Sequence, residues 1–78
     1  MNNIIQGGWI IFNDEYGNKG ILRTCCIMEA RSISENSVLI TTIDNKGGRE
    51  LPGSIEIWIN AIEVSMGFHI NQYYTIEP

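Results

Sequence analysis

Three short hydroxyl side chains lie close together near the middle of this chain, at Ser32, Ser34 and Ser37, and Arg31 directly precedes them. Hydroxyl groups and turn N–H groups donate hydrogen bonds that suit an anion, and a guanidinium pairs well with phosphate oxygens. Serine-rich corners also occur as plain turns, and loop arginines as plain surface charges. The residue types therefore predict a phosphate-binding site formed by Arg31 and this serine corner (Ser32, Ser34 and Ser37), with a simple turn as the alternative.

Three further blocks flank the serine corner, one before it and two after it. They are Gly7-Gly8-Trp9-Ile10-Ile11-Phe12-Asn13, Leu51-Pro52-Gly53-Ser54-Ile55-Glu56-Ile57 and Gly67-Phe68-His69-Ile70. Read in order, the blocks resemble a PilZ domain, a small β-barrel receptor for the bacterial second messenger cyclic di-GMP. Ser34 keeps the serine of the family's corner, whereas Ser32 replaces Asp or Asn and Ser37 replaces glycine. The resemblance spans roughly residues 4 to 70.

The resemblance implies a non-enzymatic signalling protein of the cyclic di-GMP pathway, a receptor or adaptor that acts through a protein partner. PilZ receptors carry an Arg-x-x-x-Arg motif before the first strand, but here the first arginine is Arg23. Charge-assisted hydrogen bonds contribute roughly 1.5–3 kcal/mol each, so losing two arginines weakens binding by roughly a hundredfold or more. We therefore expect weakened or lost cyclic di-GMP binding, with Arg31 as the first candidate for a replacement clamp.

The aromatic residues support a hypothesis of another class, a small structural or inhibitory β-barrel that binds a protein and never binds nucleotide. Trp9, Trp58, Tyr73 and Tyr74 are a large aromatic load for a short chain, and aromatic residues are enriched at binding hot spots. They form the predicted partner-contact surface, with burial in the core as the alternative. The net charge of −4 favours a protein partner with basic patches.

Length, composition and charge limit the number of domains and the classes of partner that this chain can have. Seventy-eight residues, 44% hydrophobic and 18% charged, predict one folded domain over residues 1–78. Five basic residues against nine acidic ones give little attraction for nucleic acid or an anionic membrane, and no apolar run approaches the ~20 residues of a membrane span. Adjacent strand residues such as Cys25 and Cys26 point to opposite faces, which predicts two free thiols, one more accessible than the other. With no second cysteine pair, we expect a reducing cytoplasm.

Catalytic and metal-binding residues are not expected. His69 is the single histidine, and as a strand residue between Phe68 and Ile70 it would face away from these apolar neighbours. Nucleophilic catalysis needs a base and an orienting acid beside a cysteine or serine, and no such motif is recognisable. We expect no cofactor beyond weakly bound cyclic di-GMP.

Alternating Ile and Val residues between Gly/Asn/Asp turns predict strands. We expect them over 4–12, 21–29, 37–43 and 54–60, with turns at 13–20 and 44–48. The segment after residue 60 is either two short strands, 62–66 and 67–71, or one long bent strand. The predicted fold is all-β, a small antiparallel PilZ-like barrel of five to six short strands, with no helix longer than about two turns.

Overall fold

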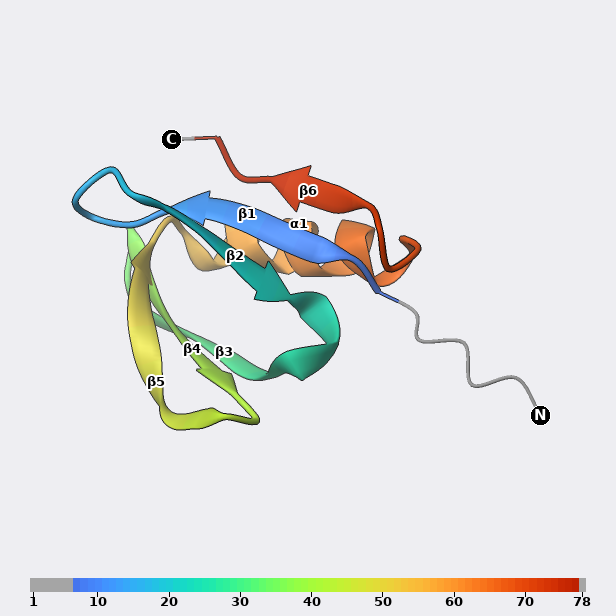
Figure 1. The fold of residues 1–78 in the computed structure, drawn as a ribbon. Helices are drawn as coiled ribbons and strands as arrows, with labels where there is room; N and C mark the ends of the chain where they lie inside the picture. Colours follow the sequence, from blue (N-terminus) through green and yellow to red (C-terminus); the bar gives the residue numbers. More distant parts are fainter. Residues whose placement is uncertain (1–6, 78) are drawn as a thin grey trace.

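Two three-stranded sheets and one helix make up the computed structural model, which describes residues 7–77 (Figure 1). In chain order the elements are β1 (Trp9–Asn13), β2 (Lys19–Arg23), a 3₁₀ turn (Thr24–Cys26), β3 (Ile27–Ser34), β4 (Ser37–Thr42), β5 (Asn45–Pro52), α1 (Ile55–Met66) and β6 (Tyr73–Thr75). One sheet has the order β2-β1-β6 and the other the order β3-β4-β5. No helix within the described residues is long and apolar enough to cross a membrane.

The prediction of a mostly β chain is confirmed, but the all-β barrel is wrong. The two sheets do not pair with each other within residues 7–77, so no closed barrel forms, and α1 is a helix of twelve residues. β6 also runs parallel to β1, which an antiparallel meander does not allow. The fold consists instead of two separate sheets and a helix that share one core.

The segment predicted as a strand over 54–60 is the first half of α1. Ser54 caps the helix, because its side-chain oxygen accepts a hydrogen bond from the Ile57 N–H at 3.3 Å. The buried positions Trp58, Ala61 and Ser65 recur at helical spacing, whereas Ile57 is half exposed. The alternation of isoleucines was therefore not a strand signal. Neither the two short strands at 62–66 and 67–71 nor the single long bent strand is present, because α1 continues to Met66 and no strand begins before Tyr73.

Of the other predicted strands, some are present as expected and others have different bounds. β4 confirms the strand expected at 37–43, and β1 covers the end of the one expected at 4–12, whose beginning lies outside the described residues. The strand expected at 21–29 is divided by the 3₁₀ turn, so its halves join different sheets as the ends of β2 and β3. The turn expected at 44–48 is shorter, because β5 already begins at Asn45.

The core lies between the two sheets and α1. Its buried members are Ile10, Phe12, Val38, Ile40, Leu51, Trp58, Ala61 and Ile76. Trp58 is fully buried, its ring centroid lies 5.8 Å from that of Phe12, and its Nε1 donates to the Pro52 carbonyl at 3.0 Å. Aromatic pairs in such tilted geometry add to the stabilisation from area burial. Trp58 thus connects α1 to both sheets.

A buried polar contact joins the 3₁₀ turn to the end of α1. The hydroxyls of Thr24 and Ser65 lie 2.6 Å apart, and the Ser65 carbonyl accepts a hydrogen bond from the Gly8 N–H at 2.8 Å. A Cβ at Gly8 would collide with the Gln72 carbonyl and with Phe68, so only glycine allows this approach. These contacts fix the start of β1 against the helix.

Candidate protein-contact surface

The serine corner is the hairpin turn between β3 and β4. Ser34 faces Ser37 in the register, and their hydroxyls are hydrogen-bonded at 2.8 Å. The Ser34 hydroxyl also accepts from the Asn36 N–H at 3.3 Å, and the Ser32 hydroxyl donates to the Ser34 carbonyl at 3.1 Å. The structure does bring the three serines together, and their hydroxyl groups bond within the turn that they form.

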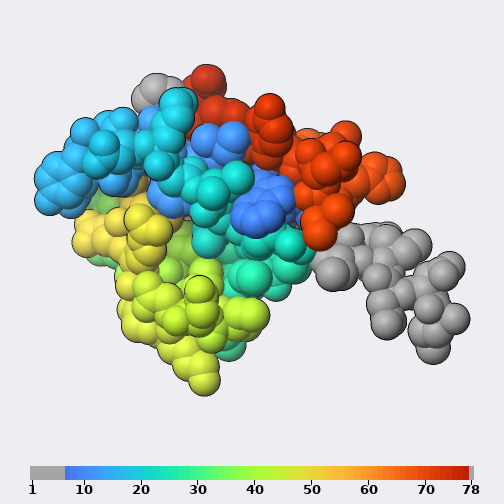
Figure 2. Space-filling model, in the orientation of Figure 1, coloured from blue at the N-terminus to red at the C-terminus, as the bar shows by residue number. Residues whose placement is uncertain are grey.

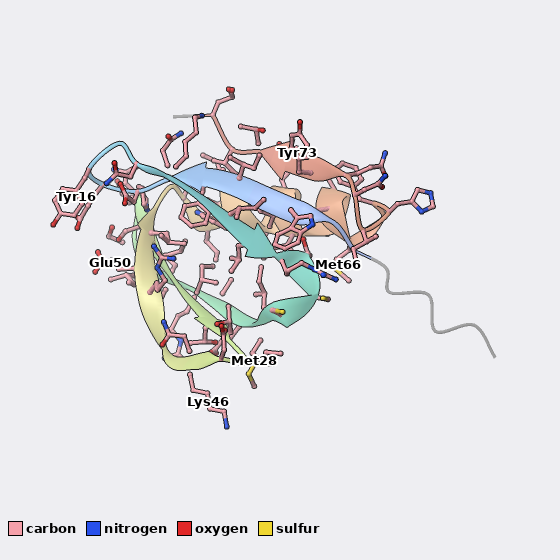
Figure 3. The ribbon with its side chains drawn as sticks, viewed as in Figure 1. Tyr16, Met28, Lys46, Glu50, Met66 and Tyr73 are labelled. Carbon is pink, nitrogen blue, oxygen red and sulfur yellow. The ribbon has the colours of Figure 1, made fainter. Side chains whose placement is uncertain are left out.

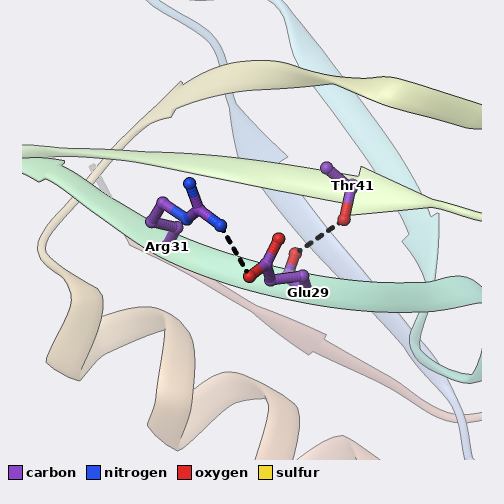
Figure 4. A network of polar contacts seen from close by, with 3 residues as sticks. All are labelled: Glu29, Arg31 and Thr41. Carbon is purple, nitrogen blue, oxygen red and sulfur yellow. Dashed lines mark hydrogen bonds and ion pairs between the residues drawn. The ribbon is translucent and has the colours of Figure 1, made fainter.

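Arg31 lies one residue before this corner but does not point the same way. In the β3–β4 register Arg31 lies opposite Leu39 and Ser32 opposite Val38, so the two side chains leave opposite faces of the sheet. The Arg31 guanidinium pairs with Glu29 at 3.0 Å, and the Glu29 carbonyl accepts from the Thr41 hydroxyl (Figure 4). The predicted ligand-binding residues therefore do not converge on one face in this structure.

The four aromatic residues predicted to contact a partner fall into two pairs. Trp58 is fully buried, and Tyr74 is half-buried against the core, where its hydroxyl accepts from Asn60 Nδ2 at 3.0 Å. For Trp58 the contact prediction is wrong, because the helix turns the ring inward. Trp9 and Tyr73 lie opposite each other in the parallel β1–β6 register, on the side of the sheet away from the core.

Alternation along β1 makes this side apolar. Ile10 and Phe12 point into the core, so Trp9 and Ile11 point outward, and each meets outward residues of β2 and β6. We call this surface the outer face; its members are Trp9, Ile11, Lys19, Ile21, Arg23, Tyr73 and Thr75. Side chains of β1, β2 and β6 lie next to one another on the side of the molecule shown in Figure 2.

Two large members of the outer face are exposed, whereas Trp9 and Ile11 are half-buried. Tyr73 is 61% exposed and Ile21 is 56% exposed. Tyr73 projects from β6 in Figure 3. Large apolar side chains that stay in water on a regular sheet mark a surface that another molecule can cover.

Contacts within the chain already fix two large side chains of the outer face, those of Trp9 and Arg23. Trp9 Nε1 donates to the Ile70 carbonyl at 2.9 Å, and the Arg23 guanidinium carbon lies 5.0 Å from the Trp9 ring centroid. Arg23 also donates to Cys25 Sγ at 3.4 Å. Fixed rings and stacked guanidinium groups lose little conformational entropy on binding.

The thiols and the histidine lie away from the outer face's centre. Both cysteines are free, as predicted, and Cys25 is more exposed than Cys26. They occupy the 3₁₀ turn rather than a strand. Burial, and then the neighbouring Cys25, raise the pKa of the Cys26 thiol. No cluster of three potential metal ligands from His, Cys, Asp or Glu occurs within the described residues, and the backbone N–H of His69 donates to Gln72 Oε1 at 2.9 Å.

Sequence reasoning found Trp9 and Tyr73 but missed their neighbours Ile11, Ile21 and Arg23. One signal was present: residues 9–12 are all apolar, so a strand there must carry hydrophobic side chains on both faces, and only one can face the core. The partners of β1 were not readable from the sequence. Comparison of the chain with protein-family models, with curated proteins and with solved structures finds no match, and its own geometry is the basis for interpreting the outer face.

Proposed function

We propose that this chain is a non-enzymatic protein-binding module, and that its partner covers the outer face of the β2-β1-β6 sheet. The observation that carries the proposal is the pairing of Trp9 with Tyr73 beside the exposed Ile21. Trp, Tyr and Arg are the residues most enriched at binding hot spots, and Arg23 stacks on Trp9 at the same place. A flat sheet face with fixed aromatic side chains suits a protein surface better than a small molecule.

The charge of the outer face defines the partner further. Lys19 and Arg23 both project from it, although the whole chain carries a net charge of −4. The expected preference for a basic partner followed from the net charge, whereas the local charge of the outer face favours acidic groups on the partner. Complementary charges at the rim chiefly raise the association rate, so binding should slow as salt increases.

Site-specific photocrosslinking in cells tests the proposal directly. A photoreactive phenylalanine derivative would replace Tyr73 in one variant and Tyr16 in another; Tyr16 is 81% exposed and lies in the β1–β2 loop, off the outer face. We expect a discrete crosslinked partner from position 73 and none from position 16. Tyr73→Ala and Ile21→Ser should then weaken affinity for that partner by about tenfold or more, whereas Tyr16→Ala should not.

Equal crosslinking at both positions, or none at position 73, would remove the outer face as the contact surface. Circular dichroism on each variant separates lost contact from lost fold. The exposed positions of Tyr73 and Ile21 make such substitutions tolerable for folding. A cytoplasmic location is also proposed, supported by the two free thiols.

The cyclic di-GMP receptor or adaptor remains a second candidate, supported by the resemblance and by the gathering of three serines at one hairpin. Calorimetry with cyclic di-GMP should give a Kd of about tens of micromolar or weaker, because the arginine pair is lacking. Sub-micromolar binding that Arg31→Ala abolishes and Arg23→Ala preserves would favour the receptor over the protein-binding module.

A further inference from the structure

A cleft of about 290 Å³ lies between β2 and β5, where the two sheets do not pair. Ile21 and Leu22 line it from β2, and Asn45, Arg49 and Leu51 line it from β5. Within residues 7–77, β2 pairs only with β1, and β5 pairs only with β4. Each of these strands therefore keeps one edge on which backbone N–H and C=O groups have no strand partner.

The floor of the cleft is the protein core itself. Phe12, Ile40 and Leu51 line the cleft and are at most 2% exposed. Thr42 and Asp44 lie at one end, where the Thr42 hydroxyl donates to Asp44 Oδ1 at 2.7 Å. An apolar floor with a few polar groups at its margin is typical of a recognition site for a peptide or a small molecule.

Arg49 is the unusual residue of this cleft. In the register it lies opposite the inward-pointing Ile40, and its guanidinium carbon lies 5.5 Å from the centroid of the Phe12 ring. Arg49 is exposed, and its guanidinium forms no ion pair or hydrogen bond with any described residue, although Asp44 lines the same cleft. This guanidinium is therefore free to pair with a carboxylate of a bound segment, for which its planar geometry is well suited.

We propose that this cleft receives an extended acidic segment of the protein partner, which adds as a strand along the free edge of β2 and places a carboxylate on Arg49. The inference rests on the proposed function in requiring a protein partner. In strand addition, main-chain hydrogen bonds supply affinity and alternate side chains supply specificity. Here the free edge of β2 offers the main-chain hydrogen bonds, and the apolar floor together with Arg49 selects the side chains.

The charge distribution favours an acidic segment. Four of the five basic residues lie on the two strands that border the cleft: Lys19, Arg23, Lys46 and Arg49. The fifth, Arg31, is already paired with Glu29 on β3. Of these residues Arg49 lines the cleft itself, whereas Lys19 and Arg23 project from the outer face of β2.

Both strands that border the cleft carry glycine close to its lining residues, Gly20 on β2 and Gly47 on β5. Gly20 lies on β2 directly over the Phe12 ring, where a Cβ would collide with ring atoms. On β5, a Cβ added to Gly47 would meet only the Asn45 side chain at 3.8 Å. Gly20 is therefore required by the packing of Phe12 under β2, whereas Gly47 leaves open space beside β5.

The first test uses a random linear nonapeptide library displayed on phage and selected on the whole protein. We expect the enriched peptides to combine alternating β-branched residues with Asp or Glu. The best peptide should bind Arg49→Gln at least about tenfold more weakly than the unchanged protein, because one charge-assisted pair is lost. Arg31→Gln, which removes an exposed arginine on β3, is the matched control and should leave affinity unchanged.

Two measurements need no change in the protein. Replacing the acidic residue of the selected peptide by its amide should cause the same loss as Arg49→Gln. Methylating single backbone nitrogens along the peptide should abolish binding at alternate positions, as a strand pairing on one edge requires. Failure to enrich any peptide, enrichment without acidic residues, or indifference to backbone methylation would each overturn the proposal.

Failure of the strand addition can be told apart from failure of the outer face as the contact surface. A crosslinked partner at position 73 whose affinity is insensitive to Arg49→Gln would keep the outer face and remove the strand addition. Absence of any crosslink at position 73, with acidic peptides still binding through Arg49, would remove the outer face and keep the cleft.

Discussion

Trp58 is the residue on which the packing of this small core depends most. It has no exposed surface, contacts Phe12 from β1 and donates to the Pro52 carbonyl at the end of β5. Trp58→Ala should cost about 3–5 kcal/mol, a large part of the total stability of a domain this short. Trp58→Phe keeps most of the ring and should cost less. Urea unfolding followed by circular dichroism measures both, and equal stability of Trp58→Ala and the unchanged protein would contradict the assignment to the core.

The buried hydroxyl groups of Thr24 and Ser65 should contribute jointly to the free energy of unfolding, so their single substitutions are not expected to be additive. Ser65→Ala leaves the Thr24 hydroxyl buried without its partner, at a cost of about 1–3 kcal/mol. Thr24→Val should cost less, because the Ser65 hydroxyl still donates to the Ile62 carbonyl at 3.3 Å. The double variant replaces both polar groups and should cost less than the sum of the two changes. A double-mutant cycle from urea titrations measures this difference. Additive effects would show that the 2.6 Å contact contributes nothing.

The raised pKa of the Cys26 thiol predicts that the folded protein loses stability at alkaline pH. The pKa of this thiol is raised from the ordinary 9.0, first by burial and then by Cys25, so the folded protein keeps the proton longer than the unfolded chain does. The stability contributed is therefore complete below pH 9.0 and falls as the pH rises from there through the folded pKa. Thermal unfolding between pH 8 and pH 10 should show a smaller decline for Cys26→Ser than for the unchanged protein. Cys25→Ser preserves the burial of Cys26 and should retain most of the decline.

At the scale of elements, α1 depends on its N-terminal cap. Ser54→Ala removes the acceptor for the Ile57 N–H and should cost about 1 kcal/mol, whereas Ser54→Asp keeps an acceptor and also suits the helix dipole. Thermal unfolding of the two variants gives the comparison. A loss for Ser54→Asp as large as for Ser54→Ala would show that the cap is not the stabilising contact.

The same segment shows why the sequence misled over the helix. Ile55, Ile57 and Ile59 alternate like a strand, and that pattern outweighed the helical spacing of Trp58, Ala61 and Ser65, two of which are small and weakly hydrophobic. β4 was readable because its inward residues alternate without competition from a second pattern. Short apolar segments fit both periods, and contacts with the rest of the molecule decide between them.

Only part of the outer face could be predicted from the sequence, because its residues come from strands that are far apart in the chain. Residue type singled out Trp9 and Tyr73, but their pairing depends on β6 lying parallel to β1, a contact between the two ends of the chain. Local patterns carry no information about such a contact. The serine corner was readable as a turn, whereas the opposite directions of Arg31 and Ser32 became visible only with the β3–β4 register.

At the scale of the whole molecule, β6 and Ile76 are part of the fold. Ile76 is a buried member of the core, and its N–H donates to the Ile11 carbonyl at 2.8 Å. A chain ending at residue 70 lacks β6 and Ile76 and should lose cooperative unfolding. Calorimetric melting checks this, with Glu77→Gln in the full chain as a control that should melt unchanged. A truncated chain that melts cooperatively at the same temperature would show that β6 is dispensable.

The parallel pairing of the first and last described strands also bears on how the protein is made. During synthesis β1 leaves the ribosome before β6 and Ile76, which lie far behind it in the sequence. Until these emerge, Ile10 and Phe12 lack part of their cover, and contacts between distant segments form slowly. At about 5–20 residues per second, the nascent chain spends several seconds in this incomplete state. The first sheet can therefore be completed only after β6 has emerged, and a chaperone that shields β1 until then should raise the yield of native protein.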